Sequence, residues 1–558
     1  MIYYSMCSVD KRLIMKKIFI VLLGAMLCGT LRAQYPPITP AWALGHIVWE
    51  DSLNTEYGAQ QIVGEYFKHD IPVNAVIIDS PWSTAYNNFE WDSSRYPDYT
   101  QMIDDFSKKN VKVILWLTGV VNNKSKDTKL QKSTNFDEAV SRKLGINHSV
   151  PATWWKGEGV HIDFTNSNAV EWWSHQLDKV FKDGIYGWKV DQGEFWFGDM
   201  VETSIGKMSN ELFRPYYYDA MYDYTVRRNP NAIIIARPYS HQGGFAASVE
   251  KMSLGWCGDF SGDWSGLKLQ IQNIYKSSQR GYGAVGCEVA GFFGAKASKE
   301  SFVRYAQFGS MTACMINGGE NGAFSNHLPW WYGKEVEEIY RNCVKLHNRL
   351  IPYLFSTLID SHLYGGSLIK NTSLNEESHQ LGDYLFTKVV TSEGGNVSFH
   401  LPSEGEWIDF FSGQKYKAGE VVCRIYSLNE FPLFVKAGAI IPVQTEKYME
   451  GRVEERNLDN GKTILLYPNG VSCRNLHLPC GDGVEYEDYS VLYDDVKGRL
   501  NVRGKRNELF TFVIKNVEGV VENVENSLGW KFDKANKELI IYAESNGDGI
   551  EILKRRNE

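Results

Sequence analysis

The stretch Gly187-Trp-Lys-Val-Asp191-Gln-Gly-Glu194-Phe-Trp196 decides the fold that we expect for this chain. Its alternation of apolar and polar residues predicts a β-strand that ends near Asp191. Lys189 and Asp191 share one face of that strand, and Gly193 interrupts it. A carboxylate at the end of a strand, next to aromatic residues, is typical of the edge where barrel enzymes place their chemistry. The structural alternative is a carboxylate that pairs with Lys189 or caps the following helix.

Seven other short apolar segments have the character of buried strands, and helical patterns separate them. The eight predicted strands lie at 42–46, 75–79, 111–117, 187–191, 232–237, 252–259, 282–288 and 311–317. Strands buried on both faces and alternating with helices predict a parallel sheet, and eight such units fit an α/β fold of the (β/α)8 TIM-barrel type. An open, doubly wound sheet is the alternative, but it would need a Gly-rich phosphate turn after its first strand, which the sequence lacks.

Charged side chains recur at the ends of these predicted strands. They are Asp79, Asp191, Arg237, Asp259 and Glu288. In a barrel, all of them would converge on the face formed by the carboxyl ends of the strands. Four acids and one arginine on a single rim are costly unless they bind something polar or are spread apart.

The length of 558 residues predicts more than one domain. We expect a catalytic barrel at 34–366, with a polar insertion near 120–160. Short strands and Gly-rich turns replace the helical pattern after residue 366, which predicts two antiparallel β-sandwich domains at 367–445 and 446–558. The net charge of −8 gives no basic footprint for nucleic acid. The aromatic content of 13% suits sugar faces, although it also suits large cores.

The first 33 residues resemble a secretory signal peptide. Lys16 and Lys17 precede the apolar run 18–26, and a small residue, Ala33, offers a cleavage point. We therefore expect export to the periplasm or the exterior of a bacterium. A lipoprotein signal using Cys28 is the weaker alternative, and no later apolar run is long enough for a membrane span.

The cysteines do not form a disulfide scaffold or a metal site. Nine are present, and removal of Cys7 and Cys28 with the signal leaves seven at irregular spacing. A local Cys473–Cys480 bridge is conceivable. Three others are expected to be buried free thiols, and they are Cys257, Cys287 and Cys314. No CxxC or short His spacing predicts a metal, and no cofactor is expected.

Several separate motifs, in order, resemble glycoside hydrolase family 31, the retaining α-glycosidases. In the predicted barrel they are Lys189-Val-Asp191-Gln-Gly-Glu194, Trp256-Cys-Gly258-Asp259-Phe-Ser-Gly-Asp-Trp264-Ser-Gly266-Leu267 and Cys287-Glu288-Val-Ala-Gly291-Phe292. Downstream they are Leu350-Ile-Pro-Tyr-Leu, Trp407-Ile-Asp-Phe-Phe-Ser-Gly413 and Phe431-Pro-Leu-Phe-Val-Lys-Ala-Gly-Ala-Ile-Ile-Pro442. The sequence departs from the family at two points. It enters the barrel without the usual N-terminal β-sandwich, and it carries Glu288 where an Asp that contacts substrate is usual.

The resemblance implies a retaining mechanism with two carboxyl groups on opposite sides of the scissile bond. We assign Asp191 as the nucleophile, with Lys189 helping to keep it charged. Asp259 is the expected acid/base, because apolar cover from Trp256 and Phe260 would raise its pKa. Asp263 is the competing candidate, although its position favours a cap on the helix that starts near Trp264.

The remaining candidate site residues are expected to contact substrate. Asp79, Arg237 and His327 are predicted to hold sugar hydroxyls. Trp116, like Trp82 and Trp196, is suited either to sugar stacking or to core packing. The other predicted contacts are Lys189, Glu194, Trp256 and Glu288, of which Glu194 has a structural ion pair as its alternative.

The expected function is that of an exo-acting α-glycoside hydrolase that releases terminal glucose, xylose or galactose from oligo- or polysaccharides. The expected partner is the carbohydrate substrate alone. A transglycosylase would share every catalytic residue, and a non-catalytic carbohydrate-binding barrel would need neither acid.

Overall fold

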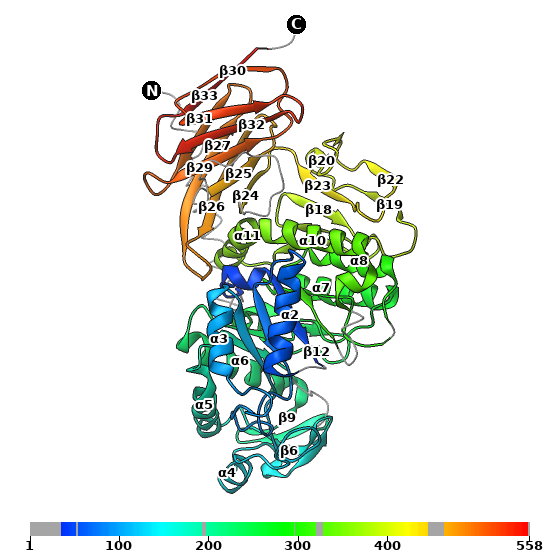
Figure 1. Ribbon diagram of the computed structural model, residues 1–558, viewed down its shortest axis with the longest axis vertical. Coiled ribbons are helices and arrows are strands. Elements are labelled where there is room, and N and C mark those ends of the chain that lie inside the picture. Colours follow the sequence, from blue (N-terminus) through cyan, green and yellow to red (C-terminus); the bar gives the residue numbers. More distant parts are fainter. Residues whose placement is uncertain are drawn as a thin grey trace, which may run out of the picture.

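A computed structural model of the chain describes residues 35–51, 54–191, 197–294, 296–319, 327–444 and 462–555. The predicted signal peptide lies outside these ranges, so export stays a prediction. Figure 1 shows the barrel at the centre of an elongated molecule, with β-rich parts at one end and a small insertion at the other.

Eight parallel strands form the barrel. In sheet order they are β13 (Leu254–Gly255), β10 (Ile233–Ala236), β7 (Gly187–Val190), β3 (Lys112–Leu117), β2 (Ala75–Ile78), β1 (His46–Glu50), β15 (Met315–Asn317) and β14 (Cys287–Val289). A parallel bridge between Gly255 and Val285 closes the ring from β13 to the residues before β14. Two hydrogen bonds support this closure, Gly255 N to Ala284 O at 2.8 Å and Gly286 N to Gly255 O at 2.9 Å. The predicted (β/α)8 barrel is therefore confirmed.

Eight of the described helices surround the barrel strands, and most of them begin at a polar capping residue. They are α2 (Glu56–Lys68), α3 (Tyr99–Lys108), α5 (Ser167–Phe181), α6 (Asn210–Arg228), α7 (Trp264–Arg280), α8 (Lys299–Gly309), α10 (Lys334–Arg349) and α11 (Ile351–Tyr364). Six of these helices start with an Asx, Ser or Thr side chain that accepts a backbone N–H of the first turn, and the capping residues are Thr55, Asp98, Asn166, Ser209, Asp263 and Ser298. Such caps satisfy donors that the helix itself leaves unpaired.

The predicted strand positions need correction at several points. The stretch 42–46 was expected to be the first strand, but Ala41–Leu44 is a 3-10 turn and the strand is β1. This turn is fully buried, so its apolar character gave the same signal as a strand. The sixth, seventh and eighth strands are shorter than predicted, because only part of each apolar run pairs with its neighbours.

The predicted insertion is a small subdomain rather than a plain loop. It contains β4 (Val120–Ser125), α4 (Phe136–Ser141), β5 (Ala152–Trp154) and β6 (Gly157–His161), and the strands pair in the order β4-β6-β5. A second hairpin, β8 (Met200–Thr203) with β9 (Gly206–Ser209), follows β7. Both lie at the end of the barrel away from the C-terminal sheets (Figure 1).

Two β-rich parts follow α11. The proximal part has a six-stranded sheet, β16 (Ile369–Ser373), β17 (Ser378–Leu381), β18 (Leu385–Lys388), β23 (Leu433–Lys436), β20 (Trp407–Asp409) and β21 (Lys415–Tyr416), with the pair β19 (Asn396–His400) and β22 (Val421–Ile425). The distal part has two five-stranded sheets. One is β24 (Ile440–Val443), β25 (Lys462–Leu466), β29 (Leu509–Ile514), β32 (Glu538–Glu544) and β31 (Gly529–Asp533), and the other is β26 (Val471–Pro479), β27 (Tyr486–Asp494), β28 (Arg499–Arg503), β33 (Ile550–Arg555) and β30 (Val520–Glu525). The structure thus confirms β-rich parts after the barrel. The exact domain limits stay a prediction, and β24 pairs within the distal sheet.

The hairpin of β26 and β27 reaches the amino-terminal end of the barrel. In its turn, the carbonyl oxygen of Gly483 accepts a hydrogen bond from Ala41 N (3.0 Å), and that of Asp482 accepts one from Trp42 N (2.9 Å). The Asp482 carboxylate also pairs with Lys112 Nζ at 2.8 Å, at the start of β3. The distal part is thereby attached to the face of the barrel opposite the strand ends that carry the candidate acids.

One of the two predictions about the cysteines is confirmed, and the other is wrong. Cys257, Cys287 and Cys314 are buried free thiols, as expected. The conceivable Cys473–Cys480 bridge is wrong, because no disulfide joins these residues. Cys473 lies within β26 and Cys480 just beyond its end. Seven residues of extended strand separate the two by roughly 23 Å, far beyond the span of a disulfide.

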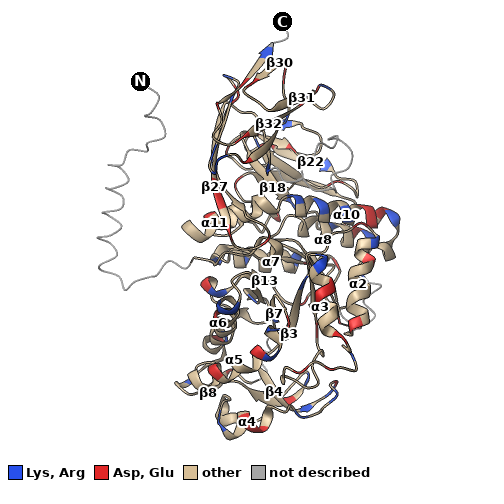
Figure 2. Ribbon diagram, turned by 60° about the vertical axis from the view of Figure 1, so that its left-hand side comes forward, with Lys and Arg blue, Asp and Glu red and all other residues tan. Residues whose placement is uncertain are grey.

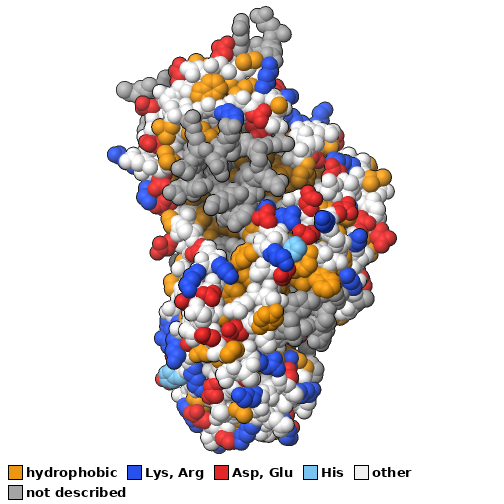
Figure 3. Space-filling view, viewed as in Figure 1, with side chains coloured by type: hydrophobic (Ala, Val, Ile, Leu, Met, Phe, Trp, Pro, Cys, Tyr) orange, Lys and Arg blue, Asp and Glu red, His pale blue; other side chains and the backbone are white. Residues whose placement is uncertain are grey.

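Charges of both signs are interspersed over the outer elements, as the helices α3 and α10 show in Figure 2. In the face seen in Figure 3, exposed apolar side chains lie in small groups among charged ones. Among the described residues, no helix has the length and apolar character to cross a membrane.

Arg304 joins the barrel to the proximal part. Its side chain on α8 is only 1% exposed. The guanidinium donates to the carbonyl oxygens of Tyr426 (2.9 Å) and Glu430 (2.8 Å), in the loop between β22 and β23. Removing the guanidinium would leave these buried carbonyls without their donor.

Arg304→Met should lower the free energy of unfolding by about 3 kcal/mol or more, because a buried charged donor is lost while its acceptors remain. Urea titration followed by circular dichroism would measure the shift in midpoint. Arg142→Met is the matched control, since the Arg142–Glu138 pair is about half exposed and should contribute less than about 1 kcal/mol. Equal midpoint shifts in the two variants would contradict this role for Arg304.

Candidate active site

The predicted site residues gather at the carboxyl ends of the barrel strands. Three of them lie within strands, and they are Trp116 in β3, Lys189 in β7 and Glu288 in β14. The others come after a strand, and they are Asp79 after β2, Asp191 after β7, Arg237 after β10, Trp256 and Asp259 after β13 and His327 after β15. Parallel strands of a closed barrel bring these ends to one face. Glu194 and Trp196 lie outside the described residues.

Asp191 is held by two donors from neighbouring strands. Arg237 Nη2 lies 2.9 Å from one carboxylate oxygen, and Trp116 Nε1 lies 3.2 Å from the other. Arg237 is 7% exposed and the Asp191 side chain 14% exposed, so the pair is largely shielded from water while the carboxylate keeps some access. Both contacts favour the charged carboxylate.

Lys189 forms its ion pair with Asp79, and its Nζ lies 3.1 Å from Asp79 Oδ2. The predicted support for Asp191 is present as an electrostatic interaction between Lys189 and Asp191, while the direct ion pair of Asp191 is with Arg237. Asp79, predicted to hold sugar hydroxyls, uses its other oxygen to accept from Ser80 N at 2.7 Å. Burial alone would lower the pKa of Lys189, but the surrounding carboxylates outweigh burial and raise it.

Trp49 is a site residue that the sequence reasoning missed. Lys189 Nζ lies 3.7 Å from the centre of the Trp49 ring and 4.7 Å from that of Trp256. The two indoles therefore cover the ammonium group while their π-faces stabilise its charge. The sequence signal was weak because the first strand was placed at 42–46, which left Trp49 outside it.

Asp259 has the properties of a group that keeps its proton. Burial raises its pKa, and the charge of Asp191 adds to the rise, while Arg237 opposes it. No described residue donates a hydrogen bond to its carboxyl group. The preceding Gly258 has φ +98°, and a Cβ there would lie 2.5 Å from Arg237 Nη1. Arg237 therefore lies between Asp191 and the backbone next to Asp259.

Asp263 has a structural role. Its side chain caps α7 by accepting from Gly266 N at 2.9 Å and from the hydroxyls of Ser261 and Ser265 at 2.8 and 2.7 Å. These bonds lower its pKa. The predicted helix cap is confirmed, and a carboxylate occupied in this way is unsuited to donating a proton.

Glu288 and His327 are buried polar groups with unused hydrogen-bonding capacity. Glu288 is 1% exposed, and both of its carboxyl oxygens lack a partner among the described residues. Burial raises its pKa to about 8, the charge of Asp259 adds to the rise, and Lys189 opposes it. Burial lowers the pKa of His327 to about 4, and its Nδ1 has no partner in the described part of the chain. Buried groups of this kind usually await a polar ligand or water.

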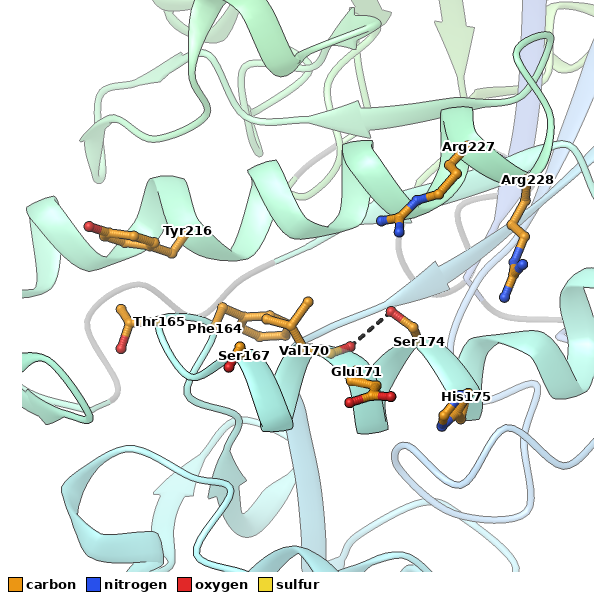
Figure 4. A pocket seen from close by; sticks show the side chains of 10 residues that line it. All are labelled: Phe164, Thr165, Ser167, Val170, Glu171, Ser174, His175, Tyr216, Arg227 and Arg228. Atoms are coloured by element: carbon orange, nitrogen blue, oxygen red, sulfur yellow. Dashed lines mark hydrogen bonds between the residues drawn. The ribbon is translucent and has the colours of Figure 1, made fainter.

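A separate groove of about 540 Å³ lies on the outside of the barrel, between α5 and α6. Figure 4 shows Tyr216 and Arg227 reaching into it from α6, opposite Glu171 and His175 of α5. Glu171 is the one carboxylate among its lining residues, so this groove lacks the pair of acids present at the strand ends. Within the described ranges, no cluster of three His, Cys, Asp or Glu side chains is arranged to hold a metal ion.

A barrel with paired carboxylates at its strand ends is the arrangement found in many sugar-cleaving enzymes. Residues 36–357 match the model of the glycosyl hydrolases family 31 TIM-barrel domain, and residues 362–441 match that of the glycosyl hydrolase family 31 C-terminal domain. The chain therefore belongs to glycosyl hydrolase family 31.

The similar proteins are distant and longer. An alpha-xylosidase of Emericella nidulans is 24% identical, over 88% of this chain and 63% of its own length. Alpha-glucosidase 2 of Bacillus thermoamyloliquefaciens is 22% identical, over 83% of this chain and 60% of its own length. The cycloalternan-forming enzyme from Listeria monocytogenes, solved with a pentasaccharide substrate, has a TM-score of 0.81 at 21% identity, covering 93% of this chain and 55% of its own. This structural likeness shows the fold, and the chain spans less than two thirds of the length of each of these three proteins.

Glu288 should make stability fall as the pH rises from about 5 to 8. Its pKa moves from 4.5 to about 8 on folding, so in this window the unfolded chain has lost a proton that the folded chain keeps. The free energy of unfolding then decreases by up to about 1.4 kcal/mol per pH unit. Glu288→Gln removes this titration and should become progressively more stable than the unaltered protein across the window.

Urea unfolding at pH 5, 6, 7 and 8 would measure this difference. Glu171→Gln, which changes an exposed glutamate, is the control and should show no such trend. A stability difference for Glu288→Gln that is the same at pH 5 and pH 8 would contradict a neutral Glu288.

Proposed function

We propose that this protein is a retaining α-glycoside hydrolase that releases a terminal sugar from oligo- or polysaccharides. One observation carries the proposal. A single arginine, Arg237, bonds the carboxylate of Asp191 and packs against the residue before Asp259, so a charged acid and an acid of raised pKa flank the same side chain. Environments that separate the protonation states of two carboxyl groups are what acid/base assignments require.

The proposed reaction has two displacements. The Asp191 carboxylate attacks the anomeric carbon, the glycosidic C–O bond breaks, and the proton of Asp259 passes to the leaving oxygen. The Asp259 carboxylate then takes a proton from water, whose oxygen attacks the anomeric carbon and releases Asp191. Two inversions give net retention of the α-configuration.

The remaining polar groups would bind the sugar in the first subsite. The unpartnered carboxyl of Glu288 is neutral near pH 7, so it can donate a hydrogen bond as well as accept one. The neutral imidazole of His327 offers a second contact. Glucose, xylose and galactose all stay within the proposal, as relatives named for xylosides and glucosides both match.

Replacing each acid should give opposite products with azide. Asp191→Ala should lose turnover by on the order of 10⁴-fold, and azide should restore it by forming the β-glycosyl azide through one inversion. Asp259→Ala should still react with a glycosyl fluoride, whose leaving group needs little acid help, and azide should then give the α-glycosyl azide. Nuclear magnetic resonance of the products distinguishes the two anomers.

Asp263→Ala is the matched control for these variants. It should lower stability by about 1 kcal/mol through loss of the cap and leave the products unchanged. Loss of turnover in Asp263→Ala, with normal turnover in Asp259→Ala, would exchange the two assignments.

A transglycosylase is the second candidate, because one structural neighbour is named for the cycloalternan that it forms. Incubation of aryl α-glucosides, α-xylosides and α-galactosides with a high concentration of acceptor sugar should release mainly free monosaccharide. Lengthened sugars as the main product would favour the transferase, and no turnover with any of the three would favour a carbohydrate-binding barrel.

A further inference from the structure

Phe293 is an exposed aromatic residue that lies beside the loop directly following the proposed acid/base, Asp259. It follows β14 and is 44% exposed, whereas Phe260, which follows Asp259, is 1% exposed. Exposed rings at a polar rim often mark a binding surface.

Backbone contacts fix the position of Phe293 relative to Asp259. The carbonyl oxygen of Phe260 accepts from Phe292 N at 2.7 Å and from Phe293 N at 3.2 Å. A parallel bridge pairs Ser261 with Phe293. Gly291 permits this approach, because its φ is +72° and a Cβ there would lie 2.5 Å from Phe260 O. These contacts hold the two loops side by side, and they form one edge of the site.

A row of aromatic rings connects this edge to the floor of the site. Trp49, whose ring faces the ammonium of Lys189, stacks on Phe292 with 5.5 Å between ring centres and an interplanar angle of 14°. Phe292 in turn meets Phe293 edge to face at 6.4 Å. The row runs from the buried Lys189–Asp79 pair to the exposed ring of Phe293.

The chemistry decides which sugar this ring meets. A general acid must lie on the leaving-group side of the scissile bond, because it protonates the leaving oxygen. Under the proposed function the first sugar would occupy the floor with the buried polar groups, and the leaving sugar would then extend outward past Asp259. A flat apolar ring suits the C–H face of a pyranose.

We propose that Phe293 stacks against the leaving-group sugar and sets the preference of the site for α-linked oligosaccharides over substrates without a second sugar. This inference rests on the proposed function. It predicts a contribution that depends on the leaving group and not on the sugar that is transferred to Asp191.

Phe293→Ala should lower kcat/KM for an α-linked disaccharide at least about fivefold, the loss of one aromatic stacking contact. It should leave kcat/KM for the glycosyl fluoride of the same sugar within about twofold, because fluoride makes no contact with the ring. Phe293→Trp should retain most of the activity on the disaccharide. The substrates are maltose and isomaltose with α-glucosyl fluoride, or the xylose or galactose equivalents if the unaltered protein prefers those sugars.

Phe411→Ala is the matched control, since Phe411 is 50% exposed in the proximal part and should affect neither substrate. Equal effects of Phe293→Ala on disaccharide and fluoride, or no effect on either, would overturn the inference and leave the proposed function standing. Failure of the unaltered protein to cleave all three glycosyl fluorides would overturn the proposed function and the inference together.

Discussion

The ion pair between Arg237 and Asp191 is the interaction on which the rest of the candidate site depends. An arginine remains protonated at all relevant pH values, so its position decides which neighbouring carboxyl group is charged. Arg237 bonds Asp191 directly at 2.9 Å and lies against the backbone next to Asp259. The same cation therefore favours the charged form of Asp191 by direct contact, whereas at Asp259 it opposes a pKa that burial raises. In the proposed mechanism, this difference gives two residues of identical chemistry their separate roles.

The second ion pair, Lys189 with Asp79, lies deeper and has a different effect. Both side chains are 6% exposed, and the tryptophan rings that cover Lys189 exclude water from the floor of the site. A dry floor strengthens electrostatic interactions between charges that lie close together. Burial in this floor also keeps Glu288 neutral near pH 7, although Lys189 and Arg237 oppose the rise in its pKa.

The barrel and its strand-end residues could be predicted from the sequence, because apolar runs indicate the buried strands and the end of each run indicates which residue lies at the rim. The sequence also separated Asp259 from Asp263, because a carboxylate three residues before Gly266 is placed to cap a helix. Which charged groups form direct ion pairs could not be predicted from the sequence. The shared strand face predicted that Lys189 acts on Asp191, and that electrostatic interaction is present. The direct ion pairs, Lys189 with Asp79 and Asp191 with Arg237, depend on how neighbouring strands are staggered and join residues 110 and 46 positions apart. Trp49 was missed because a buried turn and a buried strand have the same apolar composition.

The turn between β26 and β27, which contacts the amino-terminal end of the barrel, has a consequence for the folding of the chain. Residues near position 482 bond to Trp42 and Lys112, which leave the ribosome hundreds of residues earlier. The amino-terminal end of the barrel therefore makes these contacts, next to the buried Trp42, only after residue 482 has been synthesised. Contacts of such sequence separation slow folding and leave partly assembled chains prone to association. The distal part, which lies at the end of the barrel opposite the candidate acids, therefore supplies contacts that the barrel needs at its amino-terminal end, and removal of the β26–β27 hairpin would abolish them.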